Sequence, residues 1–301
     1  MEQVDRAPRA RGAFITFEGG DGAGKSTHIR FLADALRSQG VEVVCVREPG
    51  GTKAGEALRR IVLDPQTKGL CDEAELFIYE AARAQVVAEV IEPALARGAV
   101  VLCDRFYDST VAYQACGRGL DRAFVERANL FAARGLVPDR TVLMKSGASA
   151  ARGLARATHA SGADRMEAAG LDFHERVNAA FDELERTAPA RVRTVVSSKT
   201  KARTAKMVFE AVADVVGWDP AHLPFDDAYF EAANKLHGAS KRRRARGGRG
   251  GRGGTRKGAD ARRSKGPRSA ASGGTPSAGA GNRNSKPAQG RGRKKRGGGA
   301  S

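Results

Sequence analysis

The sequence predicts a three-layer α/β fold, in which a parallel five-stranded sheet lies between two layers of helices. Three observations support this prediction. Short apolar runs alternate with segments whose apolar residues recur at helical spacing, which is the pattern of a parallel sheet covered on both faces. The first run ends in a glycine-rich turn that leads into a helix. The part of the chain able to form a core, about 220 residues, has the size of one such domain.

The strands are expected where apolar runs are too short for a helix. Residues 13–18 (AFITFE) and 99–103 (AVVLC) are the clearest examples, because buried parallel strands are almost wholly apolar. Shorter runs of the same kind follow further along the chain. The five expected strands are residues 13–18, 41–46, 99–103, 140–144 and 193–196.

The helices are expected where apolar residues recur every three or four positions. Ile29, Leu32 and Leu36 show this spacing, and Gly40 is a stop signal after them. The same reasoning applies to each later helix. The expected helices are residues 26–38, 53–63, 73–97, 109–116, 122–134, about 148–157, 172–187 and 204–216.

The charge of the chain is concentrated in one segment. The formal net charge is +18, yet residues 241–301 contain 20 Lys and Arg and a single acid, Asp260. Alanine is the only apolar side chain there, so this tail cannot bury enough surface to offset its conformational entropy and is expected to be disordered. The folded part is close to neutral. Its charge therefore does not indicate a nucleic-acid-binding domain.

The remaining boundaries follow from composition. Residues 1–12 are polar and are expected to form a flexible extension, and residues 13–217 the folded domain. Residues 218–240 are acidic and aromatic and are expected to be helical. The four cysteines show no metal-ligand spacing, and no long apolar run or signal peptide is evident. These features predict reduced thiols, no membrane contact and a cytoplasmic location.

The turn after the first strand fits the phosphate-loop pattern G-x-x-x-x-G-K-[ST]. Its glycines let backbone N–H groups turn inward around a phosphate, and the following helix begins with its positive end there. In this pattern Lys25 reaches the β- and γ-phosphates of ATP and the Ser26 hydroxyl binds Mg²⁺. The expected ATP-binding residues are Gly19, Gly20, Asp21, Gly22, Ala23, Gly24, Lys25, Ser26 and Thr27.

The phosphate loop leaves three classes open: a small-molecule or nucleotide kinase, a GTPase and an ATPase motor. A GTPase should carry an N-K-x-D guanine box, and the sequence contains none. Three further motifs then favour a kinase. The first is residues 47–52 (REPGGT), the second is Glu75 with Tyr79 and Arg83 at helical spacing, and the third is residues 104–114 (DRFYDSTVAYQ).

Together with residues 17–27 (FEGGDGAGKST), these motifs closely resemble the bacterial thymidylate kinases over residues 13–216. The resemblance implies a P-loop kinase that transfers the γ-phosphoryl group of MgATP to dTMP, and it implies a homodimer. It places Asp21 facing the acceptor and gives Arg105 the dTMP phosphate. Asp104 would lie beside the metal and the transferred group. Such transfer needs mainly positioning and charge neutralisation.

The resemblance also implies a thymine pocket. Tyr79 would stack on the base, and Arg83, one helical turn later, would donate to a thymine carbonyl. Thr110 and Gln114 would add polar contacts. Tyr113 would close over the deoxyribose, where its ring disfavours a 2′-hydroxyl.

The chain departs from the family at two places. The fourth strand ends at Lys145, where an aspartate is usual, and no role can be assigned to this lysine. The lid, expected at about 152–167, lacks an arginine between Arg156 and Asp164. Arg156 and Arg165 are therefore the expected lid arginines that reach the transferred phosphoryl group.

Two alternatives stay open at this point. One is another P-loop nucleoside monophosphate kinase with a different acceptor. The other is a nucleic-acid-binding protein that acts through its basic tail, because an Arg- and Gly-rich chain can follow a phosphate backbone.

Overall fold

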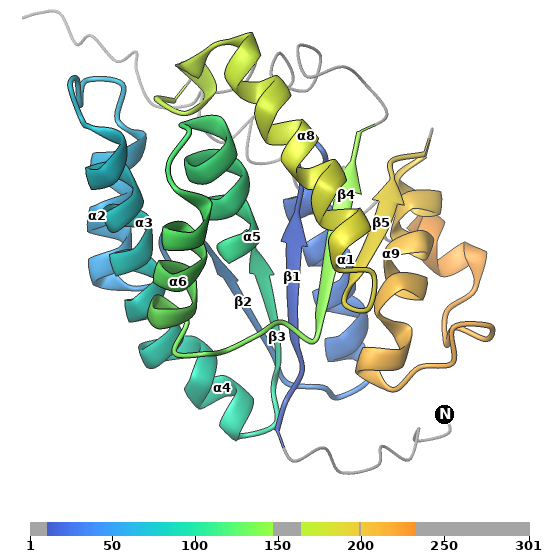
Figure 1. The fold of residues 1–301 in the computed structure, drawn as a ribbon. Helices are drawn as coiled ribbons and strands as arrows, with labels where there is room; N and C mark the ends of the chain where they lie inside the picture. The colour runs from blue at the N-terminus through green and yellow to red at the C-terminus, as the bar shows by residue number, and fades with distance from the viewer. Residues whose placement is uncertain (1–10, 147–163, 199, 233–301) are drawn as a thin grey trace, which may run out of the picture. The chain divides into compact units, whose positions relative to one another are not determined.

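The computed structural model describes residues 11–146, 164–198 and 200–232 (Figure 1). Five parallel strands form one sheet in the order β2-β3-β1-β4-β5. The strands are β1 (Phe14–Glu18), β2 (Val43–Arg47), β3 (Val100–Asp104), β4 (Arg140–Lys145) and β5 (Val192–Val196). The predicted fold class and all five strands are confirmed, with end positions that differ by one or two residues.

The helices cover both faces of this sheet. The first half of the chain contributes α1 (Lys25–Ser38), α2 (Lys53–Leu63), α3 (Asp72–Val86) and α4 (Glu92–Ala96). The second half contributes α5 (Tyr107–Thr110), α6 (Arg122–Ala132), α8 (Leu171–Thr187) and α9 (Lys201–Val216). Two π-helical stretches, η1 (Val87–Ile91) and η2 (Val111–Gly117), continue α3 and α5, and a short 3₁₀ turn, η3 (Glu167–Ala169), precedes α8.

The core is split into two layers by the sheet. Ile15 and Phe17 of β1 pack against α1 and α9, whereas Phe14 packs with η1, α4 and Phe106 on the other face. Figure 1 shows α1 and α9 behind and beside β4 and β5, with the remaining helices on the opposite face. Because alternate residues of β1 point to opposite faces, an uninterrupted apolar strand is what this position requires.

Two helix predictions need small corrections. The helix predicted over 73–97 forms, but it passes through the π-helical stretch η1 before α4. The last helix begins at Lys201, three residues earlier than predicted, because the Thr200 hydroxyl caps it by accepting from the Arg203 N–H at 3.2 Å. The helix predicted near 148–157 lies outside the described residues.

The helical prediction for residues 218–240 is wrong for its first part. Residues 218–226 form turns and an isolated bridge between Asp219 and His222, and a helical stretch begins only at Asp227. Pro220 and Pro224 explain this, since proline removes a helical hydrogen bond donor and restricts the residue before it. Residues 233–240 lie outside the described residues, as does the basic tail.

This C-terminal segment belongs to the folded core, so the boundary predicted at residue 217 lies too early. Trp218 and Phe230 are buried in the same cluster as α1 and α9. The rings of Trp218 and Phe230 lie 5.4 and 5.0 Å from that of Phe209, and the Trp218 indole donates to Gln39 at 2.8 Å. Apolar ring burial of this kind stabilises a domain by about 2 kcal/mol for each side chain.

The N-terminal boundary also shifts. The Gly12 N–H donates to the Leu95 carbonyl at 2.8 Å, and Arg11 forms a bidentate pair with Asp139. Both residues are therefore fixed in the fold. The predicted flexible extension is reduced to residues 1–10, which lie outside the described residues. Across the part of the chain that the structure describes, no helix is long and apolar enough to cross a membrane.

Candidate active site

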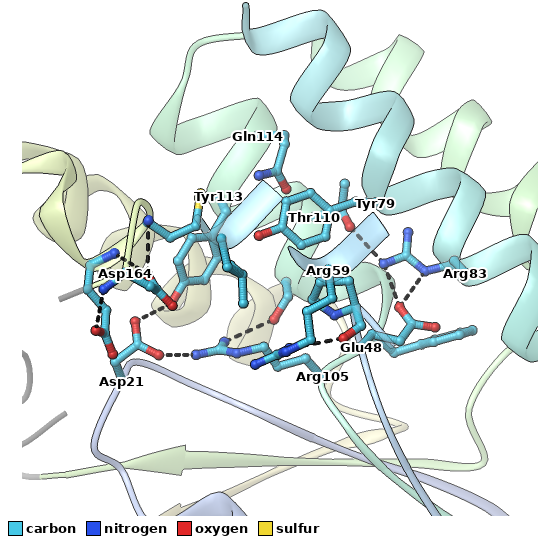
Figure 2. Close-up of a pocket in the computed structure, with 16 residues that line it drawn as sticks. Asp21, Glu48, Arg59, Tyr79, Arg83, Arg105, Thr110, Tyr113, Gln114 and Asp164 are labelled. Carbon is cyan, nitrogen blue, oxygen red and sulfur yellow. Dashed lines mark hydrogen bonds and ion pairs between the residues drawn. The ribbon is translucent and has the colours of Figure 1, made fainter. Parts of the chain in front are cut away.

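A cavity of about 190 Å³ opens at the edge of the sheet where β1, β2 and β3 end (Figure 2). Parallel strands bring their carboxyl ends to one edge, so loops far apart in the sequence meet there. The cavity is lined by predicted residues from four segments: Asp21, Tyr79, Arg83, Arg105, Thr110, Tyr113 and Gln114. Residues 164, 166 and 167, at the end of the predicted lid, also line it.

The phosphate loop lies between β1 and α1. Gly19 has a φ of 121° and packs so closely on β4 that a Cβ would stand 2.1 Å from the Met144 carbonyl oxygen, so only glycine fits. Lys25 is buried beneath the loop and its Nζ donates to the carbonyls of Gly19 and Gly20, at 2.9 and 3.0 Å. Burial, aided by the nearby charge of Arg105, lowers the pKa of Lys25 to about 8.

A hydroxyl and a carboxylate meet at the start of α1. The Ser26 Oγ donates to the Asp104 Oδ2 at 2.6 Å, which joins the phosphate loop to the end of β3. Hard oxygen donors of these two types suit Mg²⁺, which takes one or two protein ligands and completes its shell with phosphate and water. The two side chains therefore fit the predicted metal position.

Asp21 forms the centre of a second group. Its carboxylate accepts from the Arg105 Nη2 and, at 3.0 Å, from the Tyr113 hydroxyl. Burial alone would raise the pKa of Asp21, but the positive charges of Arg105 and Lys25 outweigh it and lower the pKa. The Arg105 guanidinium also lies 5.1 Å from the centre of the Tyr113 ring. Three predicted residues thus form one connected, charged cluster.

Arg105 has an unusual backbone. Its φ of 71° lies in the left-handed region, which costs a non-glycine residue about 1 kcal/mol or more. The Arg105 N–H donates to the Phe17 carbonyl at 3.0 Å, and its Nη1 donates to Gly19 and Ser109. The strained turn aims the guanidinium back at the phosphate loop.

Glu18 supports this turn and was not among the predicted residues. Its carboxylate is fully buried and accepts from the Phe106 N–H at 2.7 Å and from the Ser109 hydroxyl at 2.5 Å. Burial and the charge of Asp108 raise the pKa of Glu18 to about 7. A carboxylate at the end of an apolar strand was the sequence signal that could have identified it.

Tyr79, Thr110 and Gln114 lie together at one end of the cavity (Figure 2). Thr110 and Gln114 come from α5 and η2, where a π-helical turn widens the helix, a feature that is frequent at functional sites. Tyr79 comes from α3. The three side chains surround a space with one aromatic face and two polar edges.

Arg83 is held more firmly than predicted. Its guanidinium is fully buried and donates to Glu48, Glu80, Asn129 and Thr110, at distances of 2.7 to 3.0 Å. These contacts engage each of its three nitrogens. The expected bond to a thymine carbonyl would therefore have to share a hydrogen with one of these acceptors, most directly with the Thr110 hydroxyl.

Arg59 and Glu48 also line the cavity and were not predicted as site residues. Arg59 of α2 donates from Nη1 to the Pro49 carbonyl at 2.9 Å, and Figure 2 shows it near Arg105. Burial lowers the pKa of Arg59, with a contribution from Arg47. Glu48 is buried beside it, and its Oε1 has no hydrogen-bond partner among the residues that the structure describes. Residues 47–52 were noticed as a motif, but Arg59, seven residues further on, carried no pattern of its own.

The two arginines predicted for the lid have different outcomes. Arg156 lies outside the described residues. Arg165 does not line the cavity, because its Nη2 is bound by the buried Glu75 and its Nε donates to the Val62 carbonyl at 2.8 Å. In the structure Arg165 forms an ion pair with Glu75 of α3, and the role expected for it at the transferred phosphoryl group stays a prediction.

Lys145, to which the sequence assigned no role, forms two ion pairs in the structure. Its Nζ lies 2.7 Å from Asp182 and 2.5 Å from Glu185 of α8. Burial alone would lower the pKa of Lys145, but the bonds to these carboxylates raise it. The lysine thus ties the end of β4 to the helix that packs beside it.

Comparison with known proteins identifies related chains. The family model described as thymidylate kinase matches residues 17–208. The thymidylate kinase of Solidesulfovibrio magneticus is 48% identical over 211 residues, which cover 68% of this chain and 98% of that protein. That of Gloeobacter violaceus is 46% identical over 201 residues, covering 66% and 93%. The crystal structure of thymidylate kinase from Ehrlichia chaffeensis superposes with a TM-score of 0.50 at 32% identity, covering 61% of this chain and 92% of that one.

Proposed function

Because this chain belongs to the thymidylate kinase family, and is therefore a phosphotransferase that makes dTDP and ADP from dTMP and ATP, we propose how its own residues divide that work. The observation that supports the division is a path of contacts from Lys25, which shares the Gly19 carbonyl with Arg105, through Arg105 and Asp21 to the cavity that Tyr79 and Gln114 also line. A donor phosphate site, an acceptor phosphate site and a base site follow one another along it.

At the donor end, the phosphate loop binds the ATP phosphates. Lys25 exchanges its bonds to the loop carbonyls for the β- and γ-phosphate oxygens. Ser26 and Asp104 would hold Mg²⁺, which would neutralise charge on the phosphates. The ammonium group of Lys25 stabilises the charge that develops on the bridging oxygen as the bond between it and the γ-phosphorus breaks.

In the middle, two guanidinium groups bind the acceptor phosphate. Arg105 and Arg59 both line the cavity and lie near one another (Figure 2). They would orient the dTMP phosphate oxygen that forms the new bond to the γ-phosphorus, since guanidinium groups bind phosphate bidentately. Asp21 holds Arg105 in place and faces the acceptor. Such alignment supplies most of the catalysis in phosphoryl transfer.

At the far end, the base lies against the Tyr79 ring. Thr110 and Gln114 contact its polar edge, and Arg83 sits directly behind Thr110. Tyr113 closes over the sugar. An assay of ADP release against a panel of nucleoside monophosphates tests this assignment. We expect dTMP to give the highest kcat/KM, whereas preference for a purine or a ribonucleotide would contradict the proposed base site.

Tyr113→Ala is expected to lower the preference for dTMP over ribo-TMP by about tenfold, because it removes the ring that excludes a 2′-hydroxyl. The ratio of kcat/KM values for the two acceptors is the measurement. Tyr113→Phe is the matched control, since it keeps the ring and loses only the hydroxyl bond to Asp21. If the ratio is unchanged in Tyr113→Ala, the ring does not select the sugar, and its role is to pack against Phe173.

The chain also forms a homodimer through the exposed faces of α3 and α6. Phe77, Phe124, Leu130 and Phe131 lie on these two helices, and Phe131 is 89% exposed. The rings of Phe77 and Phe124 already contact each other, 6.3 Å apart. Large exposed apolar side chains grouped on two neighbouring helices typically mark a protein interface. Sedimentation should give twice the chain mass, and Phe131→Asp should shift it towards the monomer.

The basic tail, residues 241–301, binds polyanions without sequence preference. Its 20 Lys and Arg and its lack of aromatic residues support electrostatic contact with a phosphate backbone, with little base stacking. A chain ending at Ser240 is expected to keep full kinase activity and to lose a steeply salt-dependent affinity for single-stranded nucleic acid. Filter binding at several salt concentrations measures this.

Two results would count against this view of the tail. If the full chain shows no affinity even at low salt, the tail has no such partner. If the shortened chain loses kinase activity while it stays folded, the tail takes part in the reaction.

A further inference from the structure

Glu75 of α3 is a fully buried carboxylate beside the base site. Its Oε1 accepts from the Gln114 Nε2 at 2.8 Å and from the Arg118 Nε at 3.1 Å. Its Oε2 accepts from the Arg118 Nη2 at 3.0 Å and from Arg165. In each of these contacts the carboxylate accepts a hydrogen.

The charge state of Glu75 follows from these contacts. Burial alone would raise the pKa of Glu75, but the hydrogen bonds from Arg118, Gln114 and Arg165 outweigh it and lower the pKa. The group is therefore ionised at neutral pH. An ionised carboxylate can accept hydrogen bonds but cannot donate one.

This property fixes the side chain of Gln114. An amide has a donating NH₂ group on one side and an accepting oxygen on the other. Only the NH₂ group can face an ionised carboxylate, so the amide cannot turn over without placing its oxygen against Glu75. Gln114 is itself almost fully buried and lines the cavity next to Tyr79 and Thr110 (Figure 2).

We propose that Glu75 is a positioning residue that holds the Gln114 amide with its oxygen toward the base, and thereby selects pyrimidines that carry an N3–H. Thymine and uracil present N3–H as a donor between two carbonyls. Cytosine presents an unprotonated N3 and an amino group. Against cytosine, the amide oxygen would face another acceptor, and a buried acceptor left unpaired is costly.

The proposal rests on the proposed contact between Gln114 and the base. Arg118 and Arg165 have a different part in it, since they supply the positive charge that keeps Glu75 ionised in a buried place. Arg118 also lies over the Phe173 ring, 4.6 Å from its centre. After loss of Arg118 the packing should loosen, but Arg165 and Gln114 still donate to the Glu75 carboxylate, so the acceptor that faces Gln114 remains.

The decisive variant is Glu75→Gln, assayed with dTMP, dUMP and dCMP. An amide at position 75 can donate to the Gln114 oxygen, which lets the Gln114 amide turn over and present its NH₂ group to the base. We expect the ratio of kcat/KM for dCMP to that for dTMP to rise about tenfold or more, mainly through KM. Activity with dUMP should fall in parallel with dTMP, because both bases carry N3–H.

Arg118→Met is the matched control. It removes a partner of Glu75 without changing the acceptor on Gln114, so it should lower Tm and leave the dCMP to dTMP ratio unchanged. If Glu75→Gln does not fold, the double variant Glu75→Gln/Arg118→Met is assayed instead. The second substitution removes a guanidinium that would otherwise lose its carboxylate partner. An unchanged ratio in a folded variant lacking the carboxylate would overturn the proposal and leave Glu75 a purely structural role.

Gln114→Leu separates the proposal from the contact on which it rests. This variant should lose discrimination between thymine and cytosine, since neither a donor nor an acceptor remains at position 114. If it keeps the preference for dTMP, Gln114 does not contact the base, and the proposed base site fails along with the positioning role. If it loses the preference while Glu75→Gln keeps it, the contact stands and only the role of Glu75 is refuted.

Discussion

Lys25→Ala is expected to lower kcat for phosphoryl transfer by about a thousandfold or more, with the fold unchanged. The ammonium group lies beneath the phosphate loop, within hydrogen-bond distance of two loop carbonyls. Its charge is needed most when negative charge develops on the phosphate oxygens, so its loss should appear in kcat more than in the binding of ATP.

The stability of this variant can be predicted separately. Because burial lowers the pKa of Lys25 to about 8, the folded protein disfavours the ammonium form relative to the unfolded chain. Removing the group should therefore not cost stability, and Tm should stay within a few degrees of the wild type. Lys68→Ala, at an exposed loop position, is the matched control. Near-normal turnover in Lys25→Ala would refute the assignment of the phosphate loop.

Arg105→Ala is expected to lower kcat/KM for dTMP by about a hundredfold to a thousandfold, through both a higher KM and a lower kcat. Without the guanidinium, the acceptor phosphate loses a bidentate partner and is misplaced for attack on the γ-phosphorus. The variant also removes the positive charge that most strongly lowers the pKa of Asp21, so that pKa should rise and the acid limb of the pH–rate profile should move to higher pH.

Controls for this variant follow from its surroundings. Arg97→Ala removes an exposed ion pair with Glu42 before β3, at the other end of the sheet, and should change neither constant. Arg105→Lys keeps the charge and loses the planar fork, so it should recover part of the activity. If Arg105→Ala changes only the KM for ATP, Arg105 belongs to the donor site.

Local sequence patterns were enough to predict the fold and the place of the site. The apolar runs that became β1, β3 and β4 needed no knowledge of their partners, since a buried parallel strand must be apolar on both faces. The phosphate loop likewise depends on a few consecutive residues, because the positive φ of Gly19 and the start of α1 are set within the loop. Its position at the carboxyl edge then followed from the parallel topology.

Composition was less reliable at the C-terminal boundary. The aromatic residues of 218–232 were read as an extension of unknown role, whereas Trp218 and Phe230 complete the core beside Phe209. The pattern of one segment cannot reveal this, because the surface that the rings cover is formed by α1 and α9, which come from opposite ends of the domain. The two prolines, however, were a local signal against a helix.

The partners of charged side chains were decided only by the tertiary structure. Arg165 lies in the predicted lid, yet it binds Glu75, which lies 90 residues earlier. Arg83 fits the family motif, yet its donors are engaged by Glu48, Glu80, Asn129 and Thr110. Glu18 holds the Arg105 turn from the end of β1. The sequence by itself determined the elements, the phosphate loop and the edge where the site forms, because these depend on spacing along the chain. The tertiary structure decided which charges pair, because a buried charge takes the partner that packing brings within hydrogen-bond distance, wherever that partner lies in the chain.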